Sequence, residues 1–178
     1  MSDYTNKSKP LLERIAQMLG KSAWQPVYGA GGAYGGLTVQ DISAAVGAAR
    51  QRNDAGVQMP GCVRSEILLL HYAGRTDLIL QIAKACWNAI CKGVKKEDVA
   101  IGRTACWLAA ESLGGRQITQ DILKQEAWVL CRNYEALEHE MGYALAWMNG
   151  EKFEAEEAFK AFLRDREEVT ARRLKKAS

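Results

Sequence analysis

Hydrophobic positions recur at alternating steps of four and three residues along residues 118–149. The stripe consists of Leu123, Ala127, Leu130, Tyr134, Leu137, Met141, Ala144 and Met148. This spacing keeps one apolar side turned toward a partner for about four heptads, so it predicts one long helix packed lengthwise on others. Thr119 is a suitable N-cap. Asn149 and Gly150 both tolerate left-handed backbone, so they predict the end of the helix.

The outward side of this predicted helix is acidic. It carries Glu126, Glu135, Glu138 and Glu140 and few positive charges. About 30 residues at 1.5 Å per residue give a rod of roughly 45 Å. The segment therefore predicts the spine of a helical bundle with a solvated acidic face.

Shorter segments on both sides of the spine also have helical spacing. They cover residues 10–20, 37–52, 65–74, 75–93, 95–113 and 151–176. No segment alternates apolar and polar residues for long enough to predict a strand. The sequence predicts an all-α fold, a single-core bundle of five to seven helices with one long helix at about 118–149.

Residues 29–36, with the sequence GAGGAYGG, interrupt the helical pattern. A phosphate-binding loop needs a following Lys-Ser/Thr pair, or a strand before it and a helix after it, and Leu37 and Thr38 follow instead. The stretch predicts a flexible hinge. The alternative is a loop that reaches into a narrow site on a partner.

The composition is that of an ordinary globular protein, with 48% hydrophobic and 25% charged residues in 178. No apolar run approaches the roughly 18 residues that cross a bilayer, and the first ten residues are too polar for a signal peptide. Five cysteines without a C-x-x-C pair predict reduced, mostly buried thiols. These features predict a cytoplasmic protein with no metal, no cofactor and no membrane contact.

The net charge of +3 is unevenly distributed along the chain. It is +2 over residues 1–36, 0 over 37–62, +3 over 63–116, −5 over 117–163 and +3 over 164–178. A basic middle, an acidic spine and a basic tail predict two surfaces of different charge. One of them suits polyanions.

The basic middle contains the candidate nucleic-acid contacts. Residues 37–52 resemble the first helix and turn of a helix-turn-helix, with Ser43 allowing close approach and Gly47 the turn. Residues 65–93 loosely resemble the lead helices of a sigma-region-four-like reader, and 95–113 its reading helix. The candidate DNA-binding residues are Arg50, Arg52, Arg75, Lys84, Lys92, Lys95, Lys96, Arg103, Arg172 and Arg173.

These observations divide the chain into three parts. Residues 1–36 form a flexible lead with a short helix and the Gly-rich hinge, and residues 37–116 form a helical DNA-binding region. Residues 117–178 form the long acidic helix and a C-terminal helix with a basic tail.

Catalysis generally needs a nucleophile with a base, a carboxylate pair or a metal. His71 lies within an apolar run and predicts a hydrogen-bonded imidazole against the core, whereas His139 lies among glutamates and predicts a surface residue. No G-x-S-x-G, H-E-x-x-H or Walker pattern is present. The sequence therefore predicts a protein that is not an enzyme.

Residues 37–52 are similar to the L-S-x-T-D-V-x-A-A-x-G-x-x-Q segment of the Q antitermination proteins of lambdoid phages. The residues in register are Leu37, Asp41, Ile42, Ala44, Ala45 and Gly47. Residues 100–113, AIGRTACWLAAESL, resemble a later helix of that family. Some members carry two C-x-x-C pairs for zinc, and this chain has none. The resemblance therefore points to a zinc-free branch or to a bacterial relative such as the AlpA regulator.

The resemblance implies a mechanism and partners. The protein would bind a duplex DNA element near a promoter, with a homodimer on the DNA as one arrangement, and meet RNA polymerase paused with its sigma factor. It would then remain on the polymerase and suppress termination by crowding the RNA exit channel. The alternatives are a phage-encoded inhibitor that occludes the surface of a host defence protein, and a helix-turn-helix repressor.

Overall fold

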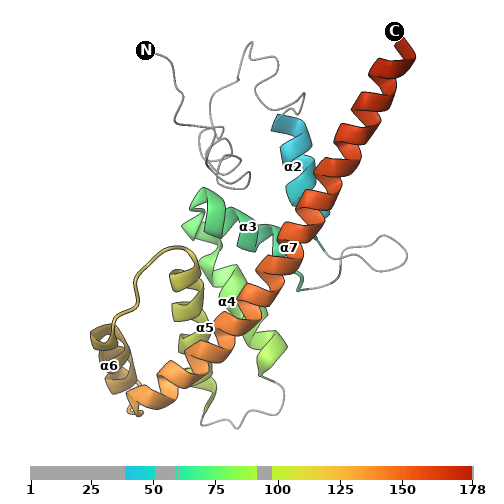
Figure 1. The fold of residues 1–178 in the computed structure, drawn as a ribbon. Coiled ribbons are helices and arrows are strands. Elements are labelled where there is room, and N and C mark those ends of the chain that lie inside the picture. The colour runs from blue at the N-terminus through green and yellow to red at the C-terminus, as the bar shows by residue number, and fades with distance from the viewer. Residues whose placement is uncertain (1–38, 51–58, 60, 92–97, 178) are drawn as a thin grey trace, which may run out of the picture.

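The computed structural model describes residues 39–50, 59, 61–91 and 98–177 (Figure 1). Within these ranges the chain forms six α-helices and one short 3-10 helix, without a strand. The prediction of an all-α fold with a helical core is confirmed. None of the helices in the described ranges is long and apolar enough to cross a membrane.

The order of elements follows the predicted segments closely as far as residue 113. The helices are α2 (Val39–Ala48), α3 (Arg64–Ala73), η2 (Thr76–Leu78), α4 (Ile79–Ile90), α5 (Val99–Leu113), α6 (Gln120–Val129) and α7 (Tyr134–Ala177). The predicted helix at 10–20 and the hinge at 29–36 lie outside the described residues.

Helix α7 is the axis of the molecule. Its 44 residues correspond to a rod of about 66 Å at 1.5 Å per residue. It packs against α2, α3, α4, α5 and α6. Figure 1 shows its first turns near α6, its middle crossing α3, and its last turns extending past α2.

The predicted single helix at 118–149 is wrong in its bounds, because the chain breaks between α6 and α7. At the break Cys131 has a φ of 51°, a left-handed backbone that is uncommon for a residue with a Cβ. The Cys131 N–H donates to the Trp128 carbonyl and the Arg132 N–H to the Ala127 carbonyl. This is a Schellman closure of α6. The predicted N-cap is present, since the Thr119 hydroxyl accepts the Ile122 N–H.

The predicted end at Asn149 and Gly150 is also wrong. Both residues lie inside α7, and the helix predicted separately at 151–176 is its second half. Buried side chains occur on both sides of the glycine, with Met148 before it and Ala155 and Phe159 after it. Burial of these side chains outweighs the cost of a helical glycine, which is about 1 kcal/mol.

The core consists of three apolar clusters along α7. The central cluster lies mainly between α3, α4, α5 and α7 and includes Ile67, Leu70, Ile82, Cys86, Cys106, Ala144 and Met148. A second, between α5, α6 and the start of α7, includes Ile101, Leu108, Leu123, Ala127 and Leu137. A third, between α2, α3 and the second half of α7, includes Ala45, Ala49, Leu68, Ala155, Phe159 and Leu163. Trp107 and Met141 pack against both of the first two.

Candidate nucleic-acid interface

Two of the predicted DNA-binding residues lie on the packed pair of helices α4 and α5. Lys84 follows Ala83, which is buried, and its own side chain is exposed. Arg103 lies between Gly102 and Ala105, which face the core, and is exposed in the same way. Within the described part of the chain, neither side chain has a hydrogen-bond or ion-pair partner. Their charges are therefore available to an external anion.

Three other predicted residues, Arg75, Arg172 and Arg50, are paired with carboxylates. Arg75 donates two hydrogen bonds to Asp77, at 2.9 and 2.8 Å. This fork raises the pKa of Arg75 and lowers the pKa of Asp77. At the far end of α7, Arg172 lies 3.4 Å from Glu168, one turn earlier. Each of these cations brings a carboxylate that would repel a phosphate.

Arg50 lies at the end of α2 and ties it to the first turn of α3. Its Nε donates to the Ser65 hydroxyl at 2.8 Å, and its terminal nitrogen contacts Glu66 at 3.1 Å. The Ser65 hydroxyl donates to the other oxygen of Glu66 at 2.7 Å. The Glu66 side chain is only 9% exposed, so this carboxylate depends on Arg50 and Ser65 for neutralisation.

The remaining candidates are not described by the structure. Arg52, Lys92, Lys95 and Lys96 lie outside the described residues, and Arg173 belongs to α7 but its side chain is not described. In the sequence, the three lysines occupy the segment that joins α4 to α5. Lys84 and Arg103 lie on the helices that flank this segment.

Helix α5 is the central helix of the core and has little free surface. Its buried residues are Ile101, Gly102, Ala105, Cys106, Leu108, Ala109, Ala110 and Leu113. A recognition helix needs a whole face free to enter the major groove, and only Ala100 and Arg103 of α5 are exposed. This burial favours contact of Arg103 with the phosphate backbone over base reading by α5.

The predicted helix-turn-helix at 37–52 is described only in part. Helix α2 is present, and Gly47 lies within it rather than in a turn. The buried face of α2, with Ala45, Val46 and Ala49, packs against the second half of α7. Thr38 and residues 51–58, which follow the predicted first helix and turn, lie outside the described residues.

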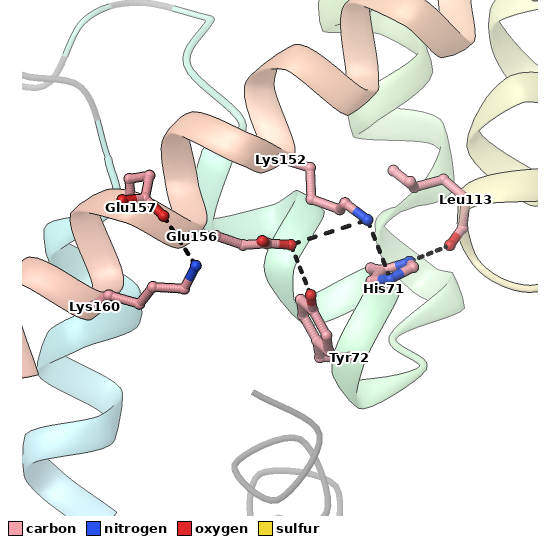
Figure 2. A network of polar contacts seen from close by, with 7 residues as sticks. All are labelled: His71, Tyr72, Leu113, Lys152, Glu156, Glu157 and Lys160. Carbon is pink, nitrogen blue, oxygen red and sulfur yellow. Dashed lines mark hydrogen bonds and ion pairs between the residues drawn. The ribbon is translucent and has the colours of Figure 1, made fainter. Parts of the chain in front are cut away.

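A polar network joins α3 to α7 (Figure 2). The Tyr72 hydroxyl donates to Glu156 at 2.6 Å. His71 donates from Nδ1 to the Leu113 carbonyl at 3.0 Å, which leaves Nε2 to accept from Lys152 at 3.4 Å. Lys152 also lies 3.9 Å from Glu156. The predicted hydrogen-bonded imidazole is therefore present, but its side chain is exposed rather than half-buried.

A second tie fixes the start of α3 on α7. Arg64 donates to Glu151 at 2.7 Å and lies 4.0 Å from Glu154. These ties hold helices together, because Tyr72 and Arg64 at the two ends of the α3 segment both contact glutamates of α7. Sequence reasoning missed them, since nothing in the local spacing relates residues near 64–72 to residues near 151–156.

The thiols and carboxylates form no group that could hold a metal ion in the part of the chain that the structure describes. No group of three or more His, Cys, Asp or Glu side chains comes together there. Cys86 and Cys106 are buried neighbours between α4 and α5. Hydrogen bonding to Cys106, together with burial, raises the pKa of the Cys86 thiol far above its ordinary value. Cys86 is therefore an uncharged core residue.

The acidic face predicted for the spine is present at the start of α7. Glu135 and Glu138 are exposed, and Glu126 and Glu140 are partly exposed on α6 and α7.

Comparison with known protein families, with curated proteins and with solved structures finds no match for this chain.

Proposed function

We propose that the protein is a DNA-binding transcription antitermination factor that loads onto RNA polymerase at a promoter-proximal pause and suppresses termination. Its place of action is then the cytoplasm. The resemblance of residues 37–52 and 100–113 to the phage antiterminators suggests this function. The observation that carries the DNA-binding part is a pair of exposed cations, Lys84 on α4 and Arg103 on α5, which have no ion-pair partner among the described residues.

Unpaired cations are what phosphate binding requires. A lysine or arginine that contacts a phosphate releases condensed counterions, and this release supplies most of the sequence-independent affinity. An arginine already paired with a carboxylate gains less, because its partner repels the incoming phosphate. The proposal therefore places the DNA on the α4–α5 pair, and gives Arg50 and Arg75 a smaller part.

The two charged surfaces support a protein that holds two partners. The exposed glutamates at the start of α7 suit a basic protein surface, and we assign them to RNA polymerase or its sigma factor. The cations on α4 and α5 suit DNA. Because the burial of α5 disfavours base reading, sequence choice would come from another segment or from the polymerase itself.

The test is a mobility-shift titration of promoter DNA at several salt concentrations, with and without RNA polymerase. The logarithm of the binding constant falls linearly with the logarithm of the salt concentration, and each phosphate contact contributes about −0.9 to the slope. One contact is therefore worth roughly eightfold in affinity at 0.1 M salt relative to 1 M. The double variant Lys84→Ala/Arg103→Ala should bind DNA about 60-fold more weakly at about 0.1 M salt. The slope of its affinity against salt concentration should become shallower by about 1.8.

A matched control removes two exposed cations that already have carboxylate partners. Arg116 pairs with Glu111 and Lys160 with Glu157. Arg116→Ala/Lys160→Ala should change affinity and slope much less than the first variant. Equal losses in both variants would mean that only net charge matters, and would reject the assignment to α4 and α5.

The polymerase arm separates the proposed function from its alternatives. A supershift that needs both DNA and polymerase, with read-through of a terminator in a transcription assay, supports antitermination. DNA binding that excludes polymerase supports a repressor. If the protein ignores both, the proposal is wrong and an occluding inhibitor becomes the better hypothesis.

A further inference from the structure

An open pocket of about 450 Å³ lies between the end of α4 and the first half of α7. Its lining consists of Trp87, Ile90, Cys91, Glu140, Tyr143, Ala146 and Trp147. This volume is in the range of small-molecule sites. Of the described residues assigned to DNA, none lines the pocket.

Three aromatic rings form the pocket walls, and two of them are fixed by the core. Trp87 and Trp147 are partly buried and pack against the central cluster. The Trp87 ring lies directly over Gly102 of α5, where an added Cβ would come within 2.2 Å of Cζ3. The glycine thus lets an edge of the indole approach the α5 backbone closely, and this sets one wall of the pocket.

The third ring is more exposed and has its own support. Tyr143 is 60% exposed and meets the His139 ring edge-to-face, with centroids 4.8 Å apart. Such a pair is attractive because the positive edge of one ring faces the negative face of the other. Tyr143, supported by His139, therefore forms the exposed border of a pocket whose other aromatic walls are Trp87 and Trp147.

The electrostatics of the pocket favour a positive ligand. Among the described residues that line the pocket, Glu140 is the only charged one, with a side chain 44% exposed. Helix α4 ends at Ile90, so the partial negative charge of its C-terminus lies at the same place. Indole and phenol rings carry negative potential on their faces, so a cation that lies over one of these three rings is attracted to it. His139 lies beside this carboxylate, with its Nδ1 3.9 Å from Glu140.

We propose that this pocket binds a small organic cation, a quaternary or alkyl ammonium compound. The ammonium group would lie over the aromatic faces beside Glu140, and its alkyl part would contact Ile90 and Ala146. A neutral molecule of the same shape gains the apolar contact only. A hydrated metal ion gains little from the indoles. The combination of aromatic walls with one carboxylate therefore selects the charge and the size of the ligand.

The test compares choline with its neutral isostere 3,3-dimethyl-1-butanol in titrations of the full-length protein followed by NMR. The indole N–H signals of Trp87 and Trp147 report on the pocket. Trp128, on α6 and 80% exposed, serves as the internal reference. Choline should shift the first two signals saturably and bind at least about tenfold more tightly than the isostere.

Two variants test the charge and the ring separately. Glu140→Gln should weaken choline roughly two- to fivefold and leave the isostere unchanged, and Tyr143→Leu should weaken choline roughly two- to fivefold. Glu138→Gln removes an exposed carboxylate of the same helix outside the pocket and should have no effect. Equal binding of the two ligands, equal effects of the two Glu variants, or no saturable shift would each overturn the proposal. DNA binding by these variants is expected to be unchanged, so this result stands apart from the proposed function.

Discussion

Arg50 is a predicted DNA-binding residue, but in the structure it contacts Ser65 and Glu66 and so joins α2 to α3. It neutralises Glu66, whose side chain is 9% exposed, while Arg50 itself is 41% exposed. Replacing Arg50 with Ala leaves this carboxylate with the Ser65 hydroxyl as its only neighbour among these three residues. We therefore expect Arg50→Ala to lower the free energy of unfolding.

The size of the effect follows from burial. Removing one partner of a fully buried ion pair costs about 3–5 kcal/mol, whereas an exposed pair is worth about 0–1 kcal/mol. The Arg50–Glu66 pair is buried on one side only, so the expected loss is about 1–3 kcal/mol. This is a substantial part of the 5–15 kcal/mol that typically stabilises a domain.

Urea unfolding followed by circular dichroism measures this loss, and two further variants identify its cause. Arg75→Ala breaks a pair whose carboxylate, Asp77, is 58% exposed, so it should destabilise the protein clearly less than Arg50→Ala does. Adding Glu66→Gln to Arg50→Ala removes the orphaned charge and should recover part of the stability. A loss below about 0.5 kcal/mol in Arg50→Ala, combined with weaker DNA binding, would refute this reasoning and return Arg50 to the DNA surface.

Two further variants test the bounds of α7 and its packing. Gly150 is exposed inside the helix and has no atom within 4 Å of an added Cβ, so Gly150→Ala should raise the free energy of unfolding by about 0.5–1 kcal/mol. Gly142 is equivalent and serves as the control, and a loss of stability at Gly150 alone would indicate a helix end there. Phe159 is 1% exposed in the cluster of α2, α3 and α7, so Phe159→Ala should cost about 3–5 kcal/mol by urea unfolding. A cost below about 1 kcal/mol would mean that this cluster does not contribute to the fold.

The hydrophobic pattern predicted which side of each helix is buried, but not where the long helix is broken. Leu123, Ala127 and Leu137 belong to one cluster, although α6 ends between them. The stripe continues through the break because both helices pack on the same cluster. A local signal was present, since the Asn133 side chain accepts the Glu135 N–H, which is typical of a helix start.

The error at Gly150 has a different physical origin. A glycine after an asparagine is a good helix end when nothing beyond it needs to be buried. Here Ala155, Phe159 and Leu163 continue the apolar face and reach α2 and α3. Their partners lie about a hundred residues earlier in the chain, so only the tertiary structure shows that the helix must continue.

The sequence predicted which cations are candidates for DNA binding. It did not predict which of them are paired with carboxylates in the folded protein. Counting cations gave Arg50, Arg75, Lys84 and Arg103 equal weight. The structure separates them, because Glu66 and Asp77 hold the first two. The aromatic pocket had no signal in the sequence, since Trp87 and Trp147 lie about 60 residues apart and meet only when α4 packs on α7.

The reach of α7 has a consequence for biosynthesis. The face of α2 is covered by Phe159 and Leu163, which leave the ribosome about 110 residues after Ala45. Until α7 has been translated as far as Leu163, α2 and α3 lack the apolar side chains of its second half that cover them in the folded protein. A ribosome that stalls before residue 155 therefore carries a nascent chain with an exposed apolar surface on α2 and α3. Chaperones and proteases recognise nascent chains of this kind.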